Sequence, residues 1–176
     1  MIEKEKYGDK FQEHLLDQYK IYVELADRVT ERRNKANQFY SSLFSISIPL
    51  ISVGVTKGII SNALLFVISI FGVFLCFGWY YNIKSYGQLN SGKFKVIHKM
   101  EEYLPFDCFK KEWDHLDQGD DSSKYLKLTK IEQFVPFVFC LLFLMIMSYN
   151  IFVTYSDSFI IFIMQYVISL IINLFL

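Results

Sequence analysis

Four apolar segments divide this chain of 176 residues, and they restrict the fold more than any other feature of the sequence. They are Leu43–Val55, Ile59–Tyr81, Phe134–Val153 and Phe159–Leu176. Their lengths approach the roughly 17–25 residues that cross the hydrocarbon core of a bilayer as a helix. Hydrophobic residues make up 53% of the chain, more than a soluble domain of this size usually contains. The sequence therefore predicts an all-α membrane protein with four transmembrane helices.

The basic residues are distributed unevenly around these segments. Of 18 Lys and Arg residues, eight precede the first segment and nine lie between the second and third, from Lys84 to Lys130. Lys57 is the one base at the first hairpin tip, and the predicted turn TYSDS at Thr154–Ser158 has none. Cytoplasmic loops of membrane proteins carry an excess of Lys and Arg. We therefore predict a multi-pass protein of the cytoplasmic membrane with both termini and the middle segment in the cytoplasm.

The segment before the first span is predicted to be a long amphipathic helix. No Pro or Gly occurs from Asp9 to Asn37, and a stripe of residues recurs at steps of three and four. A second apolar stripe lies beside it, so the apolar face is wide and must pack against the middle segment or against neighbouring subunits. The first stripe consists of Phe11, Leu15, Gln18, Tyr22, Leu25 and Val29, and the second of Leu16, Tyr19, Val23 and Ala26.

The middle segment is predicted to be a small helical insert. Tyr86–Tyr103 has a helical pattern that ends before Pro105. One side of this helix carries Leu89, Lys93, Val96, Ile97 and Met100. Thr129 and Glu132 fit a T-x-x-E capping box that would begin the helix leading into the third span. The predicted organisation is a cytoplasmic helix at 1–37, a transmembrane hairpin at 38–81, a cytoplasmic helical insert at 82–133 and a second transmembrane hairpin at 134–176.

A basic cluster directly precedes the first span and consists of Arg28, Arg32, Arg33 and Lys35. One interpretation is a topology anchor at the level of the anionic lipid headgroups. The other is a binding site for an anionic ligand, because Arg28, Arg32 and Lys35 follow helical steps of three and four and share a face. In a ring of subunits, such faces would concentrate positive potential around an axis.

Two polar stripes run through the predicted spans. Ser41, Ser45 and Ser52 lie on one face of the first span, and Gln165, Ser169 and Asn173 recur at steps of four in the last. Polar groups that face hydrocarbon are costly, so both stripes should face protein or water. They are interpreted either as helix–helix contacts through small hydrogen-bonding residues or as the lining of a pore.

The polar segments contain no complete enzyme motif. GQLNSGK at Gly87–Lys93 matches the start of a phosphate-binding P-loop, but Phe94 stands where a magnesium-binding Ser or Thr is required, and no buried strand precedes the motif. The histidines and cysteines lack metal-ligand spacing. The adjacent acids Glu101 and Glu102 are interpreted as solvated, because neighbouring helical residues do not point the same way. We expect no catalytic residue, no metal and no cofactor.

Three long stretches resemble the RipA-like octameric bacterial membrane proteins. They are HLLDQYKIYVELADRVTERRNKAN at His14–Asn37, WYYNIKSYGQLNSGKFKVIHKMEEYLP at Trp79–Pro105, and the segment Glu112–Pro136 with its KYLKLTKIEQFVP. The resemblance implies a homo-oligomer, an octamer, in the bacterial inner membrane in contact with its lipids. Similar small membrane proteins are partners of nucleotidyltransferases in antiviral defence, and by analogy this implies a nucleotide or single-stranded DNA as ligand.

The leading hypothesis is a homo-oligomeric inner-membrane channel or pore-forming effector of antiphage defence. An anionic ligand, a nucleotide or oligonucleotide, would gate it at the basic cytoplasmic helices. The alternative hypothesis is a non-conducting oligomeric scaffold that organises lipids or other proteins of the bacterial envelope. Ion leakage separates the two, because only the channel conducts.

Overall fold

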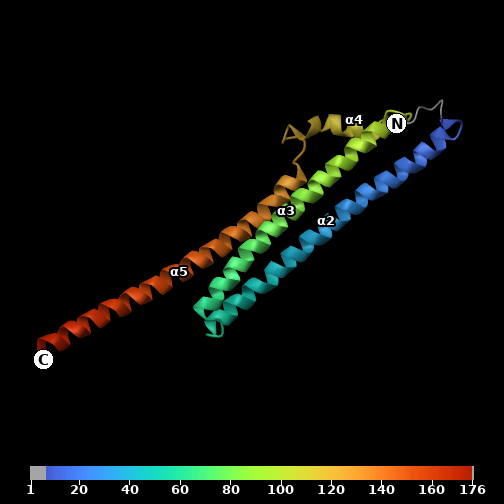
Figure 1. The fold of residues 1–176 in the computed structure, drawn as a ribbon. Coiled ribbons are helices and arrows are strands. Elements are labelled where there is room, and N and C mark those ends of the chain that lie inside the picture. Colours follow the sequence, from blue (N-terminus) through green and yellow to red (C-terminus); the bar gives the residue numbers. More distant parts are fainter. Residues whose placement is uncertain (1–6, 176) are drawn as a thin grey trace. The chain divides into compact units, whose positions relative to one another are not determined.

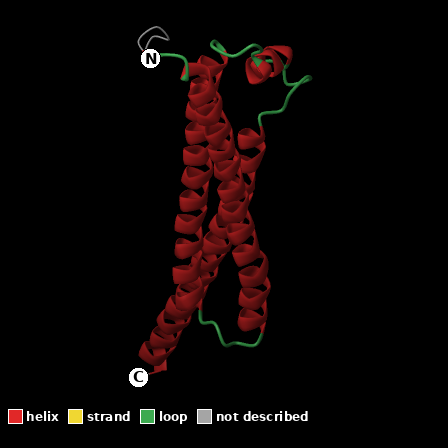
Figure 2. Cartoon of the chain, turned by 90° about the vertical axis from the view of Figure 1, so that its right-hand side faces the viewer, coloured by secondary structure: helices red, strands yellow, loops and turns green. Residues whose placement is uncertain are grey.

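The described part of the chain is helical. The computed structural model describes residues 7–175, and for residues 157–164 and 166–175 it describes the backbone alone. Three long helices are α2 (Phe11–Thr56), α3 (Asn62–Glu101) and α5 (Leu128–Phe175), as Figure 1 shows. Between α3 and α5 lie the short helix α4 (Cys108–His115) and the 3-10 helix η1 (Asp117–Gly119). Within the described residues no strand occurs (Figure 2).

Each long helix contains a stretch long and apolar enough to cross a membrane. In α5 this stretch lies in its fully described part, Leu128–Ser156. The predicted all-α membrane fold is confirmed at this level, with three such helices in the described chain where the sequence predicts four. The structure also joins segments that the sequence treats separately, because α3 contains most of the predicted second span and of the predicted helix Tyr86–Tyr103, and ends at Glu101.

Contacts divide the chain into two compact units. We call Met1–Ser42 with Trp79–Val135 the polar unit, and Leu43–Gly78 with Pro136–Leu176 the apolar unit. The units are not consecutive in sequence because α2, α3 and α5 each contribute to both. The two units are described separately below.

In the polar unit, α2 and α3 pack as antiparallel neighbours. The indole N–H of Trp79 donates to Oδ1 of Asn37 at 2.9 Å, and the ring of Tyr40 stacks on Trp79 with centroids 5.5 Å apart. Towards the other end of this unit the ring of Phe11 meets Tyr103. Residues at the start of α2 therefore meet a residue just after the end of α3, and Asn37 of α2 meets Trp79 of α3, which is the arrangement of an antiparallel pair. At this Phe11 end of the unit lies a hydrophobic cluster. It consists of Phe11, Leu15 and Met100, with Tyr19, Tyr22 and Leu104 packed around them.

Within the single chain, only part of the predicted apolar face of α2 is packed. Leu16 and Leu25 are exposed, although the sequence places them on the two apolar stripes. On the predicted common side of α3, Ile97 and Met100 are buried, whereas Leu89 and Val96 are exposed. Together with the half-buried Tyr19 and Tyr22, the buried positions of α2 from Phe11 to Arg33 recur at steps of three and four, as expected when two helices pack along one seam. Apolar residues beside that seam stay on the surface of the single chain.

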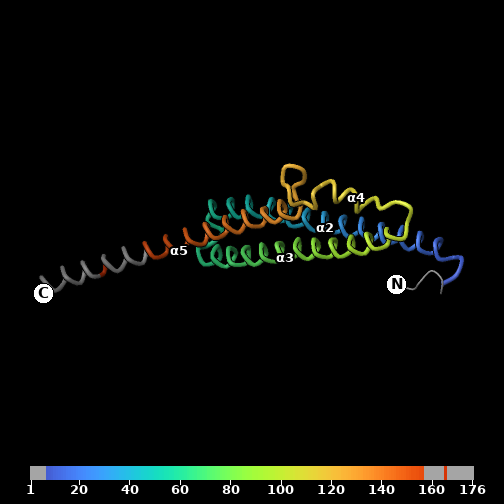
Figure 3. The backbone as a smooth tube through the Cα atoms, turned by 90° about the horizontal axis from the view of Figure 1, so that it is seen from above, coloured from blue at the N-terminus to red at the C-terminus, as the bar shows by residue number. Residues whose placement is uncertain are grey.

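The start of α5 differs from the predicted capping box. Thr129 is the second residue of the helix, and its Cγ2 lies so close to Gly87 that a Cβ there would be 2.9 Å away. Glu132 does not reach back to cap the helix but forms an ion pair with Arg33 of α2. The box prediction is therefore wrong, because a tertiary partner has recruited the side chain that the local motif would use. α4 lies beside α3 in this unit (Figure 3).

In the apolar unit, aromatic packing joins the three long helices. Phe44 of α2 stacks on Phe139 of α5 with centroids 4.9 Å apart, and it also contacts Phe143. Gly72 of α3 makes room for the ring of Phe143. At the end of the unit near the first hairpin, Nδ2 of Asn150 donates to the backbone oxygen of Asn62 at 3.0 Å. These contacts bury the inward faces, while the outward apolar side chains remain exposed.

The turn between α2 and α3 is a Schellman motif. Gly58 has a positive φ of 69° and donates its N–H to the oxygen of Val55, while the N–H of Ile59 donates to the oxygen of Gly54 at 2.9 Å. This pair of bonds satisfies backbone oxygens at the helix end. Glycine suits the left-handed position because it has no Cβ. The predicted first hairpin tip is therefore a capped helix end.

The predicted turn at Thr154–Ser158 is a second correction. The backbone of α5 stays helical through these residues and on to Phe175. The segment contains no Pro or Gly, so no residue in it opposes a helical backbone. The predicted second hairpin and a cytoplasmic C-terminus both depend on that turn.

Filling the space above Gly72 should loosen the apolar unit. A Cβ there would lie 2.5 Å from Cδ1 of Phe143, whereas no atom lies within 4 Å of one at Gly92. We expect Gly72→Ala to lower the free energy of unfolding by about 1–3 kcal/mol. Gly92→Ala, also in α3, should raise it by about 0.5–1 kcal/mol because alanine favours helix. Thermal unfolding in detergent followed by circular dichroism measures both, and equal stability of the two variants would contradict this packing.

Candidate functional site

A buried ion pair joins α2 to the start of α5 in the polar unit. Nε of Arg33 lies 3.5 Å from Oε2 of Glu132, and their side chains are 8% and 14% exposed. Among the described residues, neither of these two atoms has a hydrogen-bond partner. Two buried charges at this separation are only partly compensated. Arg33 is therefore a buried cation that retains capacity to bind a better-placed anion.

Arg33 lines a cavity of about 650 Å³ inside the polar unit. Its walls come from α2, α3, α4, the loop after η1 and the first residues of α5. The lining contains more basic than acidic residues. The basic ones are Arg33, Lys95, His98, Lys127 and Lys130, and the one carboxylic acid in the lining is Glu112. A cavity with this balance of charge attracts anions.

The cavity also has an aromatic wall. The rings of Phe94 and Phe109 meet edge to face with centroids 5.5 Å apart, and those of Trp113 and Tyr125 do so at 6.1 Å. All four residues line the cavity. Aromatic walls combined with a few polar groups are typical of small-molecule sites.

Glu101 holds α4 in place as part of this wall. Its side chain is 1% exposed, and its two carboxylate oxygens accept the backbone N–H groups of Phe109 and Lys110 at 2.9 and 3.0 Å. These donors lie in the first turn of α4, where unpaired N–H groups and the helix dipole favour an anion. The interpretation of Glu101 as a solvated acid is wrong. Its neighbour Glu102 is exposed, as adjacent helical residues on different faces should be.

Tyr19 of α2 binds the same carboxylate of Glu101. Its hydroxyl donates to Oε1 of Glu101 at 3.0 Å. Burial, followed by the hydrogen bond to this carboxylate, raises the pKa of Tyr19 to about 12 from 10.0. The phenol therefore stays protonated at physiological pH and keeps donating. One carboxylate thus joins α2, α3 and α4.

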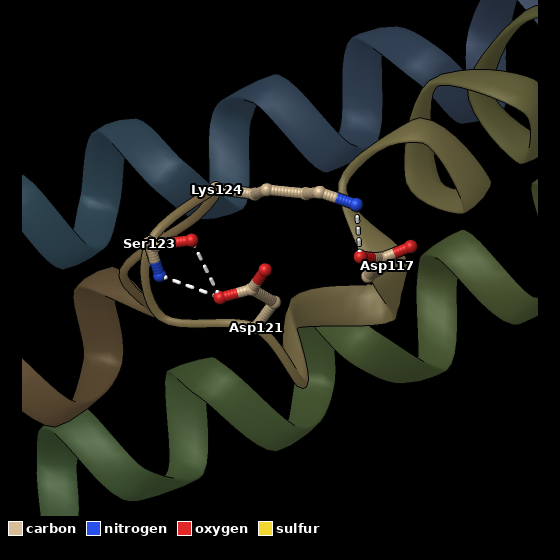
Figure 4. A network of polar contacts seen from close by, with 4 residues as sticks. All are labelled: Asp117, Asp121, Ser123 and Lys124. Carbon is tan, nitrogen blue, oxygen red and sulfur yellow. Dashed lines mark hydrogen bonds and ion pairs between the residues drawn. The ribbon is translucent and has the colours of Figure 1, made fainter.

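The loop after α4 is closed by short polar contacts (Figure 4). Lys124 forms an ion pair with Asp117, and Oδ1 of Asp121 accepts hydrogen bonds from the N–H and hydroxyl of Ser123 at 2.8 and 2.7 Å. The hydrogen bonds from Ser123 lower the pKa of Asp121. Within the described chain, no group of three His, Cys, Asp or Glu residues is arranged to hold a metal ion. These contacts shape the loop that carries Tyr125 and Lys127 into the cavity wall.

The comparisons with known proteins assign the family. A model of the Octameric membrane protein family (8xMP) matches residues 16–152, most of the chain. This chain belongs to that family. The match includes the whole cavity lining and ends before the segment Thr154–Ser158. No match is found among curated proteins or among solved structures.

This 8xMP protein does not gather the four predicted basic residues into one place. Arg28 pairs with Glu24 at 2.7 Å and Lys35 with Glu31 at 2.6 Å, all exposed on α2. The hydrogen bond from Lys35 lowers the pKa of Glu31. Arg32 is also exposed. Only Arg33 turns inward, because it occupies the buried seam of α2 one turn beyond Val29.

The polar stripes of this family member are only partly described. Ser41 is half-buried, while Ser45 and Ser52 are exposed on α2. Gln165 is exposed, and the side chains of Ser169 and Asn173 lie outside the described residues. The stripe of α2 therefore does not pack within its own chain at Ser45 and Ser52. The sequence did not single out the buried polar residues Ser69 and Asn150, which bond to backbone oxygens.

Several residues of the cavity could not be selected from sequence. Lys95, Lys127 and Lys130 are three of many bases in the middle segment, and nothing in their spacing marks them. Arg33 was the one cavity residue with a signal in the sequence. It follows Ala26 and Val29 at helical steps of three and four, and a charge on such an apolar face requires a partner.

Removing the Arg33 charge should destabilise the protein much more than removing the adjacent charge. Arg33→Gln leaves Glu132 buried without its cation, so we expect a loss of about 3 kcal/mol in the free energy of unfolding. Arg32→Gln should change it by less than about 0.5 kcal/mol because Arg32 is exposed. The double variant Arg33→Gln/Glu132→Gln should recover most of the loss. Chemical denaturation of the purified protein measures all three, and a double variant as unstable as the single one would contradict the pairing.

Glu101 and Glu102 give a second matched comparison. Glu101→Gln replaces an oxygen that accepts a helix N–H by an amide that cannot, and we expect a loss of about 2–3 kcal/mol. Glu102→Gln should change stability by less than about 0.5 kcal/mol. Hydrogen exchange of the α4 amides reports the local effect. Unchanged protection of Phe109 and Lys110 in the Glu101 variant would rule out this anchoring role.

Proposed function

We propose that this chain forms a homo-octameric pore in the bacterial inner membrane, and that an anionic ligand in the polar unit controls whether it conducts. Membrane insertion is supported by the three apolar helices and by the family. The family name describes octameric membrane proteins, which supports the octamer. Large apolar side chains remain exposed on the apolar unit of the single chain, among them Phe71, Phe74 and Phe137. Lipid tails and neighbouring subunits would cover them.

The observation that carries the ligand control is the Arg33–Glu132 pair at the wall of a basic cavity. The two side chains join α2 to α5, and both helices continue into the apolar unit. An anion that enters the cavity competes with Glu132 for Arg33. Weakening this pair shifts the balance between arrangements of α2 and α5, which is how a ligand with different affinities for two states changes their populations.

The distribution of bases supports an orientation with the polar unit in the cytoplasm. Most of the Lys and Arg residues lie in this unit, and Lys57 is the base at the hairpin tip. In this orientation the cavity is open to ligands made inside the cell. A role in antiphage defence with a nucleotidyltransferase partner is part of the same proposal, and a nucleotidyltransferase gene beside this one would support it.

The serine stripe supplies the test of conduction. Ser45→Leu/Ser52→Leu would turn polar positions of the proposed pore into an apolar constriction, which stops ions by excluding water. We expect ion flux through proteoliposomes to fall by on the order of tenfold, because ions do not cross a dewetted constriction. The matched control Ile46→Leu/Val53→Leu changes exposed apolar neighbours on the same turns and should leave flux unchanged. Flux is measured with and without added adenosine monophosphate and inorganic phosphate.

A well-folded wild-type oligomer that conducts under none of these conditions would contradict the pore. That result favours the non-conducting scaffold. Equal loss of flux in both double variants would contradict the assignment of the serines to the pore while leaving conduction itself intact. The first result tests whether the protein conducts, and the second tests whether the serines line the pore.

A further inference from the structure

We infer, building on the proposed function, that the cavity binds a single nucleotide with its phosphate at the basic wall and its base at the aromatic wall. The sequence pointed instead to the exposed basic face of α2. On that face Arg28 and Lys35 are already paired with glutamates of their own helix. The cavity lies elsewhere in the polar unit and shares only Arg33 with the predicted set.

The phosphate end is built by Arg33, Lys95 and Lys130. Arg33 is nine-tenths buried and lines the cavity, and its Nε has no hydrogen-bond partner among the residues described. Within the described residues, Lys95 and Lys130 form no ion pair within 4.0 Å. Lys127, by contrast, pairs with Asp120 at 3.7 Å. A guanidinium and two ammonium groups that line one cavity supply the positive charge and the N–H donors that a phosphate dianion requires.

The base end is built by the aromatic residues and one amide. Phe94, Phe109, Trp113 and Tyr125 present flat apolar surface, on which any nucleobase can stack. Asn90 of α3 lines the same cavity, and its Oδ1 is buried without a hydrogen-bond partner in the described structure. A buried acceptor discriminates strongly for ligands that donate to it. The exocyclic amino group of adenine or cytosine is such a donor, so an amino-bearing base is expected.

The size of the cavity selects a single nucleotide over a polymer. Its volume of about 650 Å³ lies within the range of roughly 300–1,000 Å³ typical of small-molecule pockets. A single strand instead requires a basic groove that follows its backbone over several nucleotides. On the exposed face of α2, Arg28 and Lys35 already pair with glutamates of their own helix. A lipid headgroup offers the phosphate but no planar ring, so it satisfies only one of the two walls.

Equilibrium dialysis on the purified full-length oligomer tests this site with four probes. They are adenosine monophosphate, ribose 5-phosphate, inorganic phosphate and a short single-stranded DNA. We expect adenosine monophosphate to bind about tenfold more tightly than ribose 5-phosphate, the lower end of what an unpaired buried acceptor and a stacking wall discriminate. Trp113→Leu should weaken binding of adenosine monophosphate and leave ribose 5-phosphate unchanged.

The basic wall is tested with variants matched in charge. Lys95→Gln/Lys130→Gln removes two bases from the cavity, and we expect it to weaken adenosine monophosphate binding by about tenfold or more, because two charged contacts are lost. Lys20→Gln/Lys35→Gln removes two bases from the exposed face of α2 and should bind as the wild type does. Both pairs avoid the buried Arg33, so stability is not at issue.

Several results would overturn the site. Equal affinity for all three phosphates rejects the base pocket, and tighter binding of the DNA rejects the single-nucleotide ligand. Competition by nanodiscs of phosphatidylglycerol, but not of phosphatidylcholine, assigns the phosphate site to lipid. No binding by any probe rejects the site even if the protein conducts ions. Tight nucleotide binding with no effect on flux supports the site and rejects the ligand control in the proposed function.

Discussion

The carboxylate of Glu101 is the interaction on which the polar unit depends. It is almost fully buried, and it accepts hydrogen bonds from Tyr19 of α2 and from the first N–H groups of α4. An eight-residue helix has little stability of its own, so α4 needs such an anchor. With α4 held against α3, Phe109 and Trp113 line the cavity together with Tyr125 and the first residues of α5. The basic cavity is the space that this arrangement leaves.

A charged pair buried between two helices contributes more to selecting one helix arrangement than to the free energy of folding. Arg33 and Glu132 would be replaced by apolar residues if packing alone were required, because burying both charges costs more than their attraction returns unless the geometry is close. Their separation of 3.5 Å without a hydrogen bond is not close. The pair is therefore well suited to rearrangement by a competing anion, and it lies where two long helices meet within the polar unit.

Much of the fold could be predicted from the chain, and the errors have physical causes. The apolar blocks predicted membrane-crossing helices because lipid leaves backbone groups no partner but their own helix. The wide apolar face of α2 was predicted, but composition does not reveal which of its residues, such as Leu16 or Leu25, lack a neighbour within the single chain. The turn at Thr154–Ser158 rested on polarity alone, and polar residues without Pro or Gly do not end a helix.

The sequence by itself determined that the chain is a helical membrane protein and which family it belongs to, because hydrophobic blocks and long similar stretches are local features. Only the tertiary structure decided which charges act together. Arg33 and Glu132 are 99 positions apart, and Glu101 differs from Glu102 only in the face it presents. Partners so distant are chosen by the register between helices, and that register follows from packing of the whole polar unit.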